Sequence, residues 1–154
     1  MKYLFYFINK YFKEFHGIRQ YIDQAKETAA KKGYVESLLG RRRYIPEINS
    51  SAWNLKQAAE RMAINMPIQG TAADLVKKAM IQIYKLFKEP EIKNSARLLL
   101  QVHDELLFEI KEDKVKEVAK EIKNIMENIE QFEVPLKVDL NSGRNWGKLK
   151  KLEF

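Results

Sequence analysis

The chain has 154 residues, which is the usual length of one domain. Lys and Arg number 28 against 21 Asp and Glu, and the formal charge of +7 favours a polyanionic partner such as nucleic acid or an anionic membrane surface. Because Cys is absent, disulfides and thiolate metal sites are excluded, and the two histidines make a His-rich zinc site a poor hypothesis. Any metal would therefore rely mainly on oxygen ligands.

The N-terminal segment MKYLFYFINKYFKEF begins with a basic residue and an apolar patch. Its uncharged apolar stretch is six residues long and no small-residue cleavage site follows, so we reject a signal peptide and a membrane span and expect a cytoplasmic protein. Apolar residues recur at helical spacing through residue 32, and Gly33 supplies a stop. This pattern predicts one long helix, or two helices broken near Gly17.

The next segment, YVESLLGRRRYIPEI, predicts a small hairpin. Its strands are expected at residues 34–39 and 42–45, on either side of Gly40 and Arg41, and Pro46 closes it. The hairpin carries three arginines, Arg41, Arg42 and Arg43, which suit phosphate groups because phosphate contacts fix position and give salt-dependent affinity.

Residues 55–66 contain strong helix formers and no Gly, which predicts a helix. Pro67 and Gly70 interrupt this pattern. The segment from Thr71 to Asp74 then matches the spacing of a capping box, with Asp in place of the usual Glu. We therefore expect a second helix that runs from there to about Phe87.

The second half of the chain begins with the segment LLLQVHDELLFEI. Its apolar runs, Leu98–Val102 and Leu106–Ile110, are short and unbroken, which favours strands buried on both faces and paired antiparallel about the HDE triplet. Residues 111–131 show the period of an amphipathic helix, and residues 134–140 alternate as a strand covered on one face does. The order strand, strand, helix, strand predicts an α+β fold, an antiparallel sheet of three strands with helices on one side.

The HDE triplet, His103, Asp104 and Glu105, has two interpretations. Asp is common in turns, so the three residues could simply form the bend of the hairpin. Two adjacent acids, however, repel each other unless a cation or a base is nearby. The bend contains no Gly or Asn, and we therefore expect a cation site there.

A polar stripe precedes the hairpin. Arg61, Asn65 and Gln69 stand at i, i+4 and i+8, so they share one face if the helix continues past Pro67. Polar groups in an otherwise apolar helix need partners, either buried protein groups or a ligand. The minor-groove edge of every base pair offers acceptors, which donors such as these and His103 could recognise without regard to sequence.

Three segments together resemble a known family. GYVESLLGRRRYIPEI, QAAERMAINMPIQGTAADL and LLLQVHDELLFEI occur in the order shown by bacterial and phage family A DNA polymerases, of the DNA polymerase I type. The resemblance runs from about Phe7 to Trp146. It implies a DNA polymerase that binds primer-template DNA and deoxynucleoside triphosphates and uses Mg²⁺. On this basis residues 1–70 are the later fingers and residues 71–154 the palm, within one domain.

The resemblance also implies roles for individual residues. Asp104 would bind the catalytic metal ions, Glu105 would be a neighbouring carboxylate of smaller or indirect catalytic role, and His103 would touch the primer end. The polar stripe matches positions that contact the minor groove and the template, which are Arg61, Asn65 and Gln69.

The family also has features that are not found in these 154 residues. They are a first palm strand with a second metal-binding aspartate, in a DYSxIELR-like sequence, and a fingers helix that holds the nucleotide. A two-metal site needs carboxylates from separate strands, and adjacent residues such as Asp104 and Glu105 point to opposite sides. Asp74 is expected to cap its helix, and Asp139 lies on a strand of uncertain place, so neither is a good substitute.

Three functions therefore remain open. The chain could be the C-terminal catalytic piece of a polymerase, inactive alone and joined to an upstream fragment. It could be a stand-alone remnant or accessory module that binds DNA without chemistry. A basic helical protein for RNA or membrane surfaces is the third, which the apolar strand at 98–102 disfavours. An incomplete palm sheet would also leave an open edge, so we expect the isolated chain to self-associate.

Overall fold

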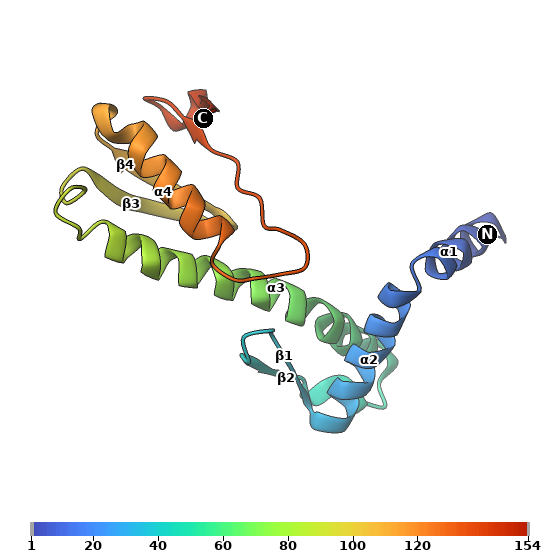
Figure 1. Cartoon of the computed structure of the whole chain (residues 1–154). Helices are drawn as coiled ribbons and strands as arrows, with labels where there is room; N and C mark the ends of the chain where they lie inside the picture. The colour runs from blue at the N-terminus through green and yellow to red at the C-terminus, as the bar shows by residue number, and fades with distance from the viewer. Residues whose placement is uncertain (1, 154) are drawn as a thin grey trace. The chain divides into compact units, whose positions relative to one another are not determined.

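The computed structural model describes residues 2–153, and Figure 1 shows their helices and strands. The helices are α1 (Lys2–Glu14), α2 (His16–Lys32), α3 (Trp53–Leu86) and α4 (Val115–Glu127). The strands form three antiparallel pairs, β1 (Tyr34–Glu36) with β2 (Arg42–Tyr44), β3 (Ala96–Val102) with β4 (Glu105–Ile110), and β5 (Asn141–Ser142) with β6 (Lys150–Lys151). Short 3-10 helices occupy Pro46–Asn49, Glu112–Lys114 and Trp146–Lys148. The expected α+β class is confirmed.

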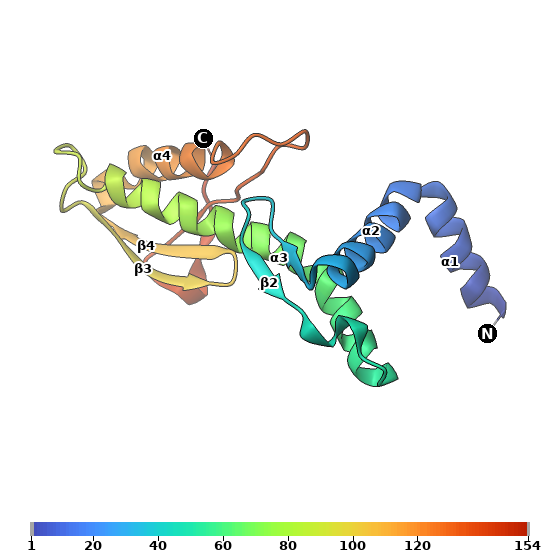
Figure 2. The ribbon, with the colours of Figure 1, turned by 90° about the horizontal axis from the view of Figure 1, so that it is seen from below.

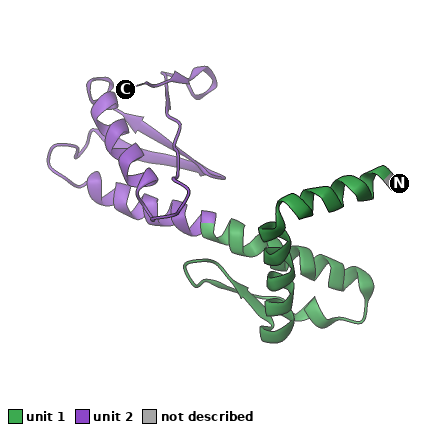
Figure 3. Ribbon diagram, turned by 45° about the vertical axis from the view of Figure 1, so that its right-hand side comes forward, with its two compact units in different colours: residues 1–71 green, residues 72–154 purple. Residues whose placement is uncertain are grey.

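The chain folds as two compact units, residues 1–71 and residues 72–154, which Figure 3 shows in different colours. The boundary falls inside α3, one residue from the division expected after residue 70. Each unit has its own cluster of buried hydrophobic side chains. The expectation that the whole chain acts as one domain stays a prediction.

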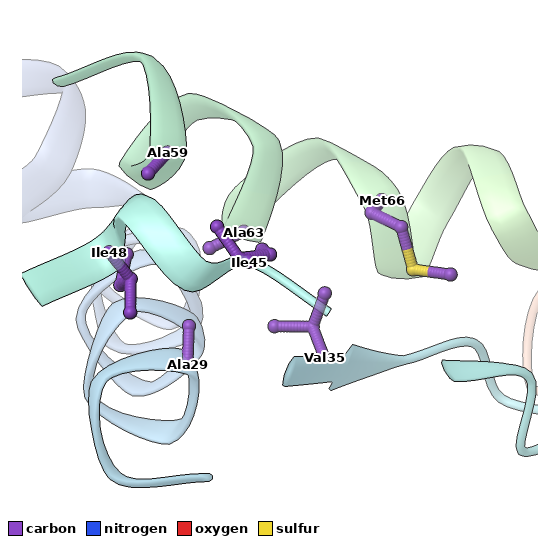
Figure 4. Packing of buried hydrophobic residues seen from close by; sticks show 7 residues of the cluster. All are labelled: Ala29, Val35, Ile45, Ile48, Ala59, Ala63 and Met66. Carbon is purple, nitrogen blue, oxygen red and sulfur yellow. The ribbon is translucent and has the colours of Figure 1, made fainter. Parts of the chain in front are cut away.

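The core of the first unit lies where α2, β1 and the first half of α3 meet (Figure 4). Small side chains allow the helices to approach closely. The buried residues are Ala29, Val35, Ile45, Ile48, Ala59, Ala63 and Met66. Two polar contacts join α2 to α3, a hydrogen bond of 2.7 Å from the Tyr21 hydroxyl to the Ile64 carbonyl and an ion pair of 2.7 Å between Lys26 and Glu60. Partial burial raises the pKa of Tyr21.

Of the two arrangements expected for the N-terminal segment, the structure has two helices. The chain interrupts its helix at Phe15, two residues before Gly17. Gly33 ends α2 as expected, because its φ of 75° is a left-handed conformation that a glycine adopts without strain, and its N–H donates to the Ala29 carbonyl. The apolar side chains of α1 are largely exposed within the described residues.

Helix α3 is continuous, so the break expected at Pro67 and Gly70 is wrong. Pro67 cannot donate a backbone hydrogen bond, yet core side chains on both sides of it hold the helix in place. Thr71 is not an N-cap either, since its hydroxyl donates to the Pro67 carbonyl at 2.6 Å inside the helix. Asp74 is likewise a helix-interior residue, and the capping-box assignment is therefore wrong.

The core of the second unit lies between one face of the β3–β4 hairpin and the two helices that cover it, the second half of α3 and α4 (Figure 2). The helices contribute Ala79, Ile83, Leu86, Val118 and Ile122, and the hairpin contributes Ala96, Leu106, Phe108 and Ile110. The opposite face of the hairpin is open. Leu99 and Leu100 are 46% and 48% exposed, so the expectation of burial on both faces is wrong for this chain.

The expected third strand, residues 134–140, is also wrong. These residues form no strand, and the β3–β4 sheet has two strands among the described residues. Leu136 still packs against the core, and the Val138 N–H donates to the Glu127 side chain at 2.9 Å. Leu136, Val138 and Leu140 are partly buried, as the alternation indicated, but Val134 is 76% exposed. Alternation also carries no information about a backbone partner. Among residues 2–153, no helix is both long and apolar enough to cross a membrane.

Candidate functional site

We call His103, Asp104 and Glu105 the acidic tip, which lies where a two-residue bend joins β3 to β4. Val102 pairs with Glu105, so the bend is His103 and Asp104 alone, and the expected three-residue bend is corrected by one residue. His103 has a φ of 54°, as tight two-residue hairpins require, and its carbonyl accepts a hydrogen bond of 3.1 Å from the Gln101 side chain. His103, Asp104 and Glu105 are all exposed.

The Asp104 side chain makes no hydrogen bond or ion pair with the side chains or backbone of residues 2–153. Its exposed carboxylate offers oxygen ligands, which Mg²⁺ prefers. Over the same residues, however, no group of three or more His, Asp or Glu side chains could hold a metal ion. Asp104 and Glu105 therefore suit Mg²⁺ in ligand type but do not complete a site, and the metal-binding role of Asp104 stays a prediction.

The polar stripe lies on one exposed face of α3, as its spacing requires once the helix is continuous. Arg61, Asn65 and Gln69 are all exposed, which rules out burial against other protein groups of the first unit. They line an open pocket of about 680 Å³ together with the β1–β2 hairpin. We call it the arginine pocket, because four arginines and no acidic residue line it, the arginines being Arg41, Arg42, Arg43 and Arg61.

The three consecutive arginines have different surroundings. Arg41 is tied to the protein, since its guanidinium donates to the Gly70 carbonyl at 3.0 Å. Arg43 turns toward α3, where its guanidinium lies 3.3 Å from the Met62 sulfur. Arg42 pairs with Glu36 at 2.6 Å, and this hydrogen bond raises the pKa of Arg42. The sequence suggested that all three arginines suit phosphate groups, and this stays a prediction; Arg41 also has a contact within the protein.

A hydrogen-bonded latch fixes the hairpin to α3 beside the pocket. The Leu38 N–H donates to the Thr71 hydroxyl oxygen at 2.9 Å, and this buried hydroxyl also bonds to the Pro67 carbonyl. Gly70 allows the close approach, because an added Cβ would lie 3.2 Å from the Met66 methyl group and 3.4 Å from Ser37 Cβ. Sequence reasoning missed this role of Thr71. A Thr and a Gly soon after a helical Pro were the available signal.

Replacing Thr71 by Val should loosen this latch. The change removes both hydrogen bonds of a buried hydroxyl while keeping its shape, and we expect the first unit to lose about 1–3 kcal/mol. Hydrogen exchange of the Leu38 amide, followed by NMR, should become faster. Thr71→Ser is the matched control and should keep the amide protected. Equal exchange of Leu38 in Thr71→Val and the unmodified chain would contradict the latch.

The residues of the candidate site fall in two places. The arginine pocket lies within the first unit, and His103, Asp104 and Glu105 lie within the second. The structure thus brings the stripe together with the hairpin arginines. A groove shared by the pocket and the acidic tip stays a prediction.

Known proteins share this sequence and fold. The family model for DNA polymerase family A matches residues 5–148. DNA polymerase I of Bacillus subtilis is 47% identical over 140 residues, which are 91% of this chain and 16% of that protein. The thermostable DNA polymerase I of Thermus filiformis is 46% identical over 146 residues, 94% of this chain and 17% of its own length.

A solved structure agrees with these relatives. The POL domain of Pol1 from M. smegmatis, in complex with DNA primer-template and dNTP, has a TM-score of 0.80 and 44% identity, and the match covers 84% of this chain and 23% of that one. The chain therefore spans only a small part of the proteins it matches. The matched segment includes the hairpin arginines, the polar stripe and the acidic tip, and the chain belongs to DNA polymerase family A.

Proposed function

We propose that this chain takes part in DNA-templated DNA synthesis as the C-terminal palm part of a family A polymerase, and that it binds primer-template DNA. The observation that carries the proposal is the arginine pocket, where exposed guanidinium and amide groups meet without an acidic residue. Arginines attract phosphates, and Asn65 and Gln69 can donate to minor-groove acceptors of any base pair. The similar POL domain was solved with primer-template DNA and dNTP, which supports the same ligands here.

The acidic tip supplies the chemical part of this proposal. Asp104 would bind Mg²⁺ together with a carboxylate from an upstream polymerase segment, since the described residues contain no group of three or more side chains that could hold a metal ion. Mg²⁺ stabilises the charge on the attacking and leaving oxygens of phosphoryl transfer. Glu105 would act as a neighbouring carboxylate of indirect role, and His103 would contact the primer end. Deoxynucleoside triphosphates are the substrates.

Primer extension tests this function. The 154-residue chain is incubated with primer-template DNA, Mg²⁺ and deoxynucleoside triphosphates, alone and after mixing with an upstream fragment of DNA polymerase I from Bacillus subtilis. We expect DNA binding by the chain alone and extension only in the mixture. No binding to primer-template DNA would overturn the proposal.

The second candidate is an accessory module that binds DNA without chemistry. The absence of a three-ligand group between residues 2 and 153 favours it over an enzyme complete in itself. Binding of primer-template DNA without extension in every mixture would identify this function.

The polar stripe should govern affinity for duplex DNA. Asn65→Ala and Gln69→Ala each remove a donor, and we expect affinity to fall about 2- to 12-fold for every duplex sequence. Arg61→Ala should also reduce the slope of log affinity against log salt by about 1. Fluorescence anisotropy at several salt concentrations measures both effects. Gln82→Ala, an exposed Gln of α3 in the second unit, is the control and should bind normally.

The open face of the β3–β4 hairpin should make the isolated chain self-associate. The two-stranded sheet offers unpaired edges, and Leu99 and Leu100 expose apolar surface beside them. We expect a dimer or larger assembly at micromolar concentration in sedimentation experiments, and Leu100→Glu should shift it toward the monomer. A compact monomer across this range would refute the expectation.

A further inference from the structure

The β1–β2 hairpin has two different faces. Partners directly opposite each other in an antiparallel pair project to the same side. Val35, which pairs with Arg43, is 3% exposed and faces the core of the first unit. The other side carries the Tyr34–Tyr44 and Glu36–Arg42 pairs. We call it the tyrosine face, made of Tyr34, Glu36, Arg42 and Tyr44.

Cations and rings are ordered on the tyrosine face. The Tyr34 and Tyr44 ring centroids lie 5.6 Å apart at an interplanar angle of 62°. The Arg42 guanidinium carbon lies 4.7 Å from the Tyr34 centroid, and the Lys32 Nζ lies 5.9 Å from it. The Tyr34 ring therefore lies close to two cations and to a second aromatic ring. Tyr44, in contrast, is 69% exposed.

Stabilisation of the hairpin explains only part of this arrangement. A two-stranded sheet is marginal on its own, and cross-strand pairs such as Glu36–Arg42 support it. That role accounts for the contacts of Tyr34 and Arg42. It leaves most of the Tyr44 ring, which is 69% exposed, available for contact with a partner.

The charge and position of the face indicate the partner. Lys32 and Arg42 oppose one carboxylate, that of Glu36, which leaves an excess of positive charge beside the exposed ring. Arg42 also lines the arginine pocket, so the face adjoins the proposed duplex site within the same unit. The exposed Tyr44 ring packs against the Tyr34 ring, over which both cations lie. Aromatic rings combined with positive charge are the means by which proteins bind single-stranded nucleic acid, because every base has a face that can stack.

We propose that the tyrosine face binds an unpaired nucleotide of the template strand where that strand leaves the duplex. The base stacks on Tyr44, and Lys32 and Arg42 contact the adjoining phosphates. This inference rests on the proposed function, because it requires DNA with a single-stranded template portion.

The affinity experiment compares two DNAs that share one duplex, a blunt form and a form with an unpaired 5′ template extension. Tyr44→Ala should weaken binding of the extended DNA about 5- to 150-fold and leave the blunt duplex unchanged. Tyr44→Phe keeps the ring and should bind as the unmodified chain does. Tyr84→Ala is the matched control, since Tyr84 is 61% exposed and also has a lysine 4.5 Å from its ring, and it should bind both DNAs normally.

A photocrosslink on the unmodified chain gives a second measurement that does not depend on the folding of a variant. 5-Iodouracil is placed in the unpaired extension, and the modified peptide is identified by mass spectrometry. We expect a crosslink to Tyr44. Loss of affinity that is equal for blunt and extended DNA, or a crosslink elsewhere with none at Tyr44, would overturn the inference.

The outcomes separate this inference from the proposed function. If the chain binds blunt and extended DNA equally and Tyr44 does not crosslink, the inference fails and duplex binding stands. If the chain binds neither DNA, the proposed function fails. The inference, which rests on that function, then falls with it.

Discussion

Replacing Asp104 by Asn should lower the rate of primer extension about 100-fold or more while DNA binding persists. The measurement uses a chimera in which this chain replaces the 140 matched residues of DNA polymerase I from Bacillus subtilis. The Asn amide has the shape of the carboxylate but lacks the charge that holds a divalent cation, and electrostatic stabilisation of this kind contributes strongly to catalysis. The Asp104 side chain is exposed and makes no hydrogen bond or ion pair among the described residues, so the variant should remain folded.

Three further variants make this prediction specific. Glu105→Gln should reduce extension less than Asp104→Asn does. Asp113→Asn changes an exposed acid elsewhere in the second unit and should have no effect. Asp139→Asn should retain Mg²⁺ binding in the chimera. If metal binding were lost in the Asp139 variant but kept in the Asp104 variant, the assignment of Asp104 would be wrong.

Replacing Ile83 by Ala should destabilise the second unit by about 2–5 kcal/mol. Ile83 is 1% exposed and belongs to the cluster formed by α3, α4 and the hairpin, where a smaller side chain leaves a cavity. Since a domain is stable by only about 5–15 kcal/mol, this loss is a large share of the total. Ile81→Ala is the control two residues away, because Ile81 is 58% exposed and its truncation should change stability by less than about 0.5 kcal/mol.

Hydrogen exchange measured by mass spectrometry shows which part of the chain is destabilised in Ile83→Ala. Because the two cores consist of different residues, amides of β3, β4 and α4 should exchange faster in Ile83→Ala while those of α2 keep their protection. Equal loss of protection in α2 and α4 would mean that the two units unfold together.

Local sequence patterns predicted much of this fold. Gly33 ends its helix because a left-handed residue after a helical run favours Gly. The paired apolar runs around residue 103 predicted the hairpin. The i, i+4, i+8 spacing placed Arg61, Asn65 and Gln69 on one face, and the structure confirms this once α3 is continuous. These features depend on neighbouring residues alone, which explains why a sequence reveals them.

The errors came from interactions between distant residues. Pro67 would end an isolated helix, but core packing on both sides keeps α3 intact. Alternation in residues 134–140 signals one buried face and cannot name a pairing partner. The contact of Arg41 with Gly70 and the two faces of the hairpin likewise depend on how β1 and β2 pair and dock. Packing between distant parts of the chain can thus override the intrinsic preference of a residue for a helix or a strand.

The bond between Leu38 and Thr71 limits how this region can change during evolution. The turn between β1 and β2 is closed by its own hydrogen bonds, from the Gly40 N–H to Ser37 and from the Ser37 N–H to Arg41. Inserting one residue there would shift the register of β2 against β1 by one residue and reverse the side on which the side chains of β2 project. Arg43, which now points toward α3, would then point away from it. Divergence in this segment should therefore proceed through amino-acid replacement at constant length, and insertions should accumulate elsewhere.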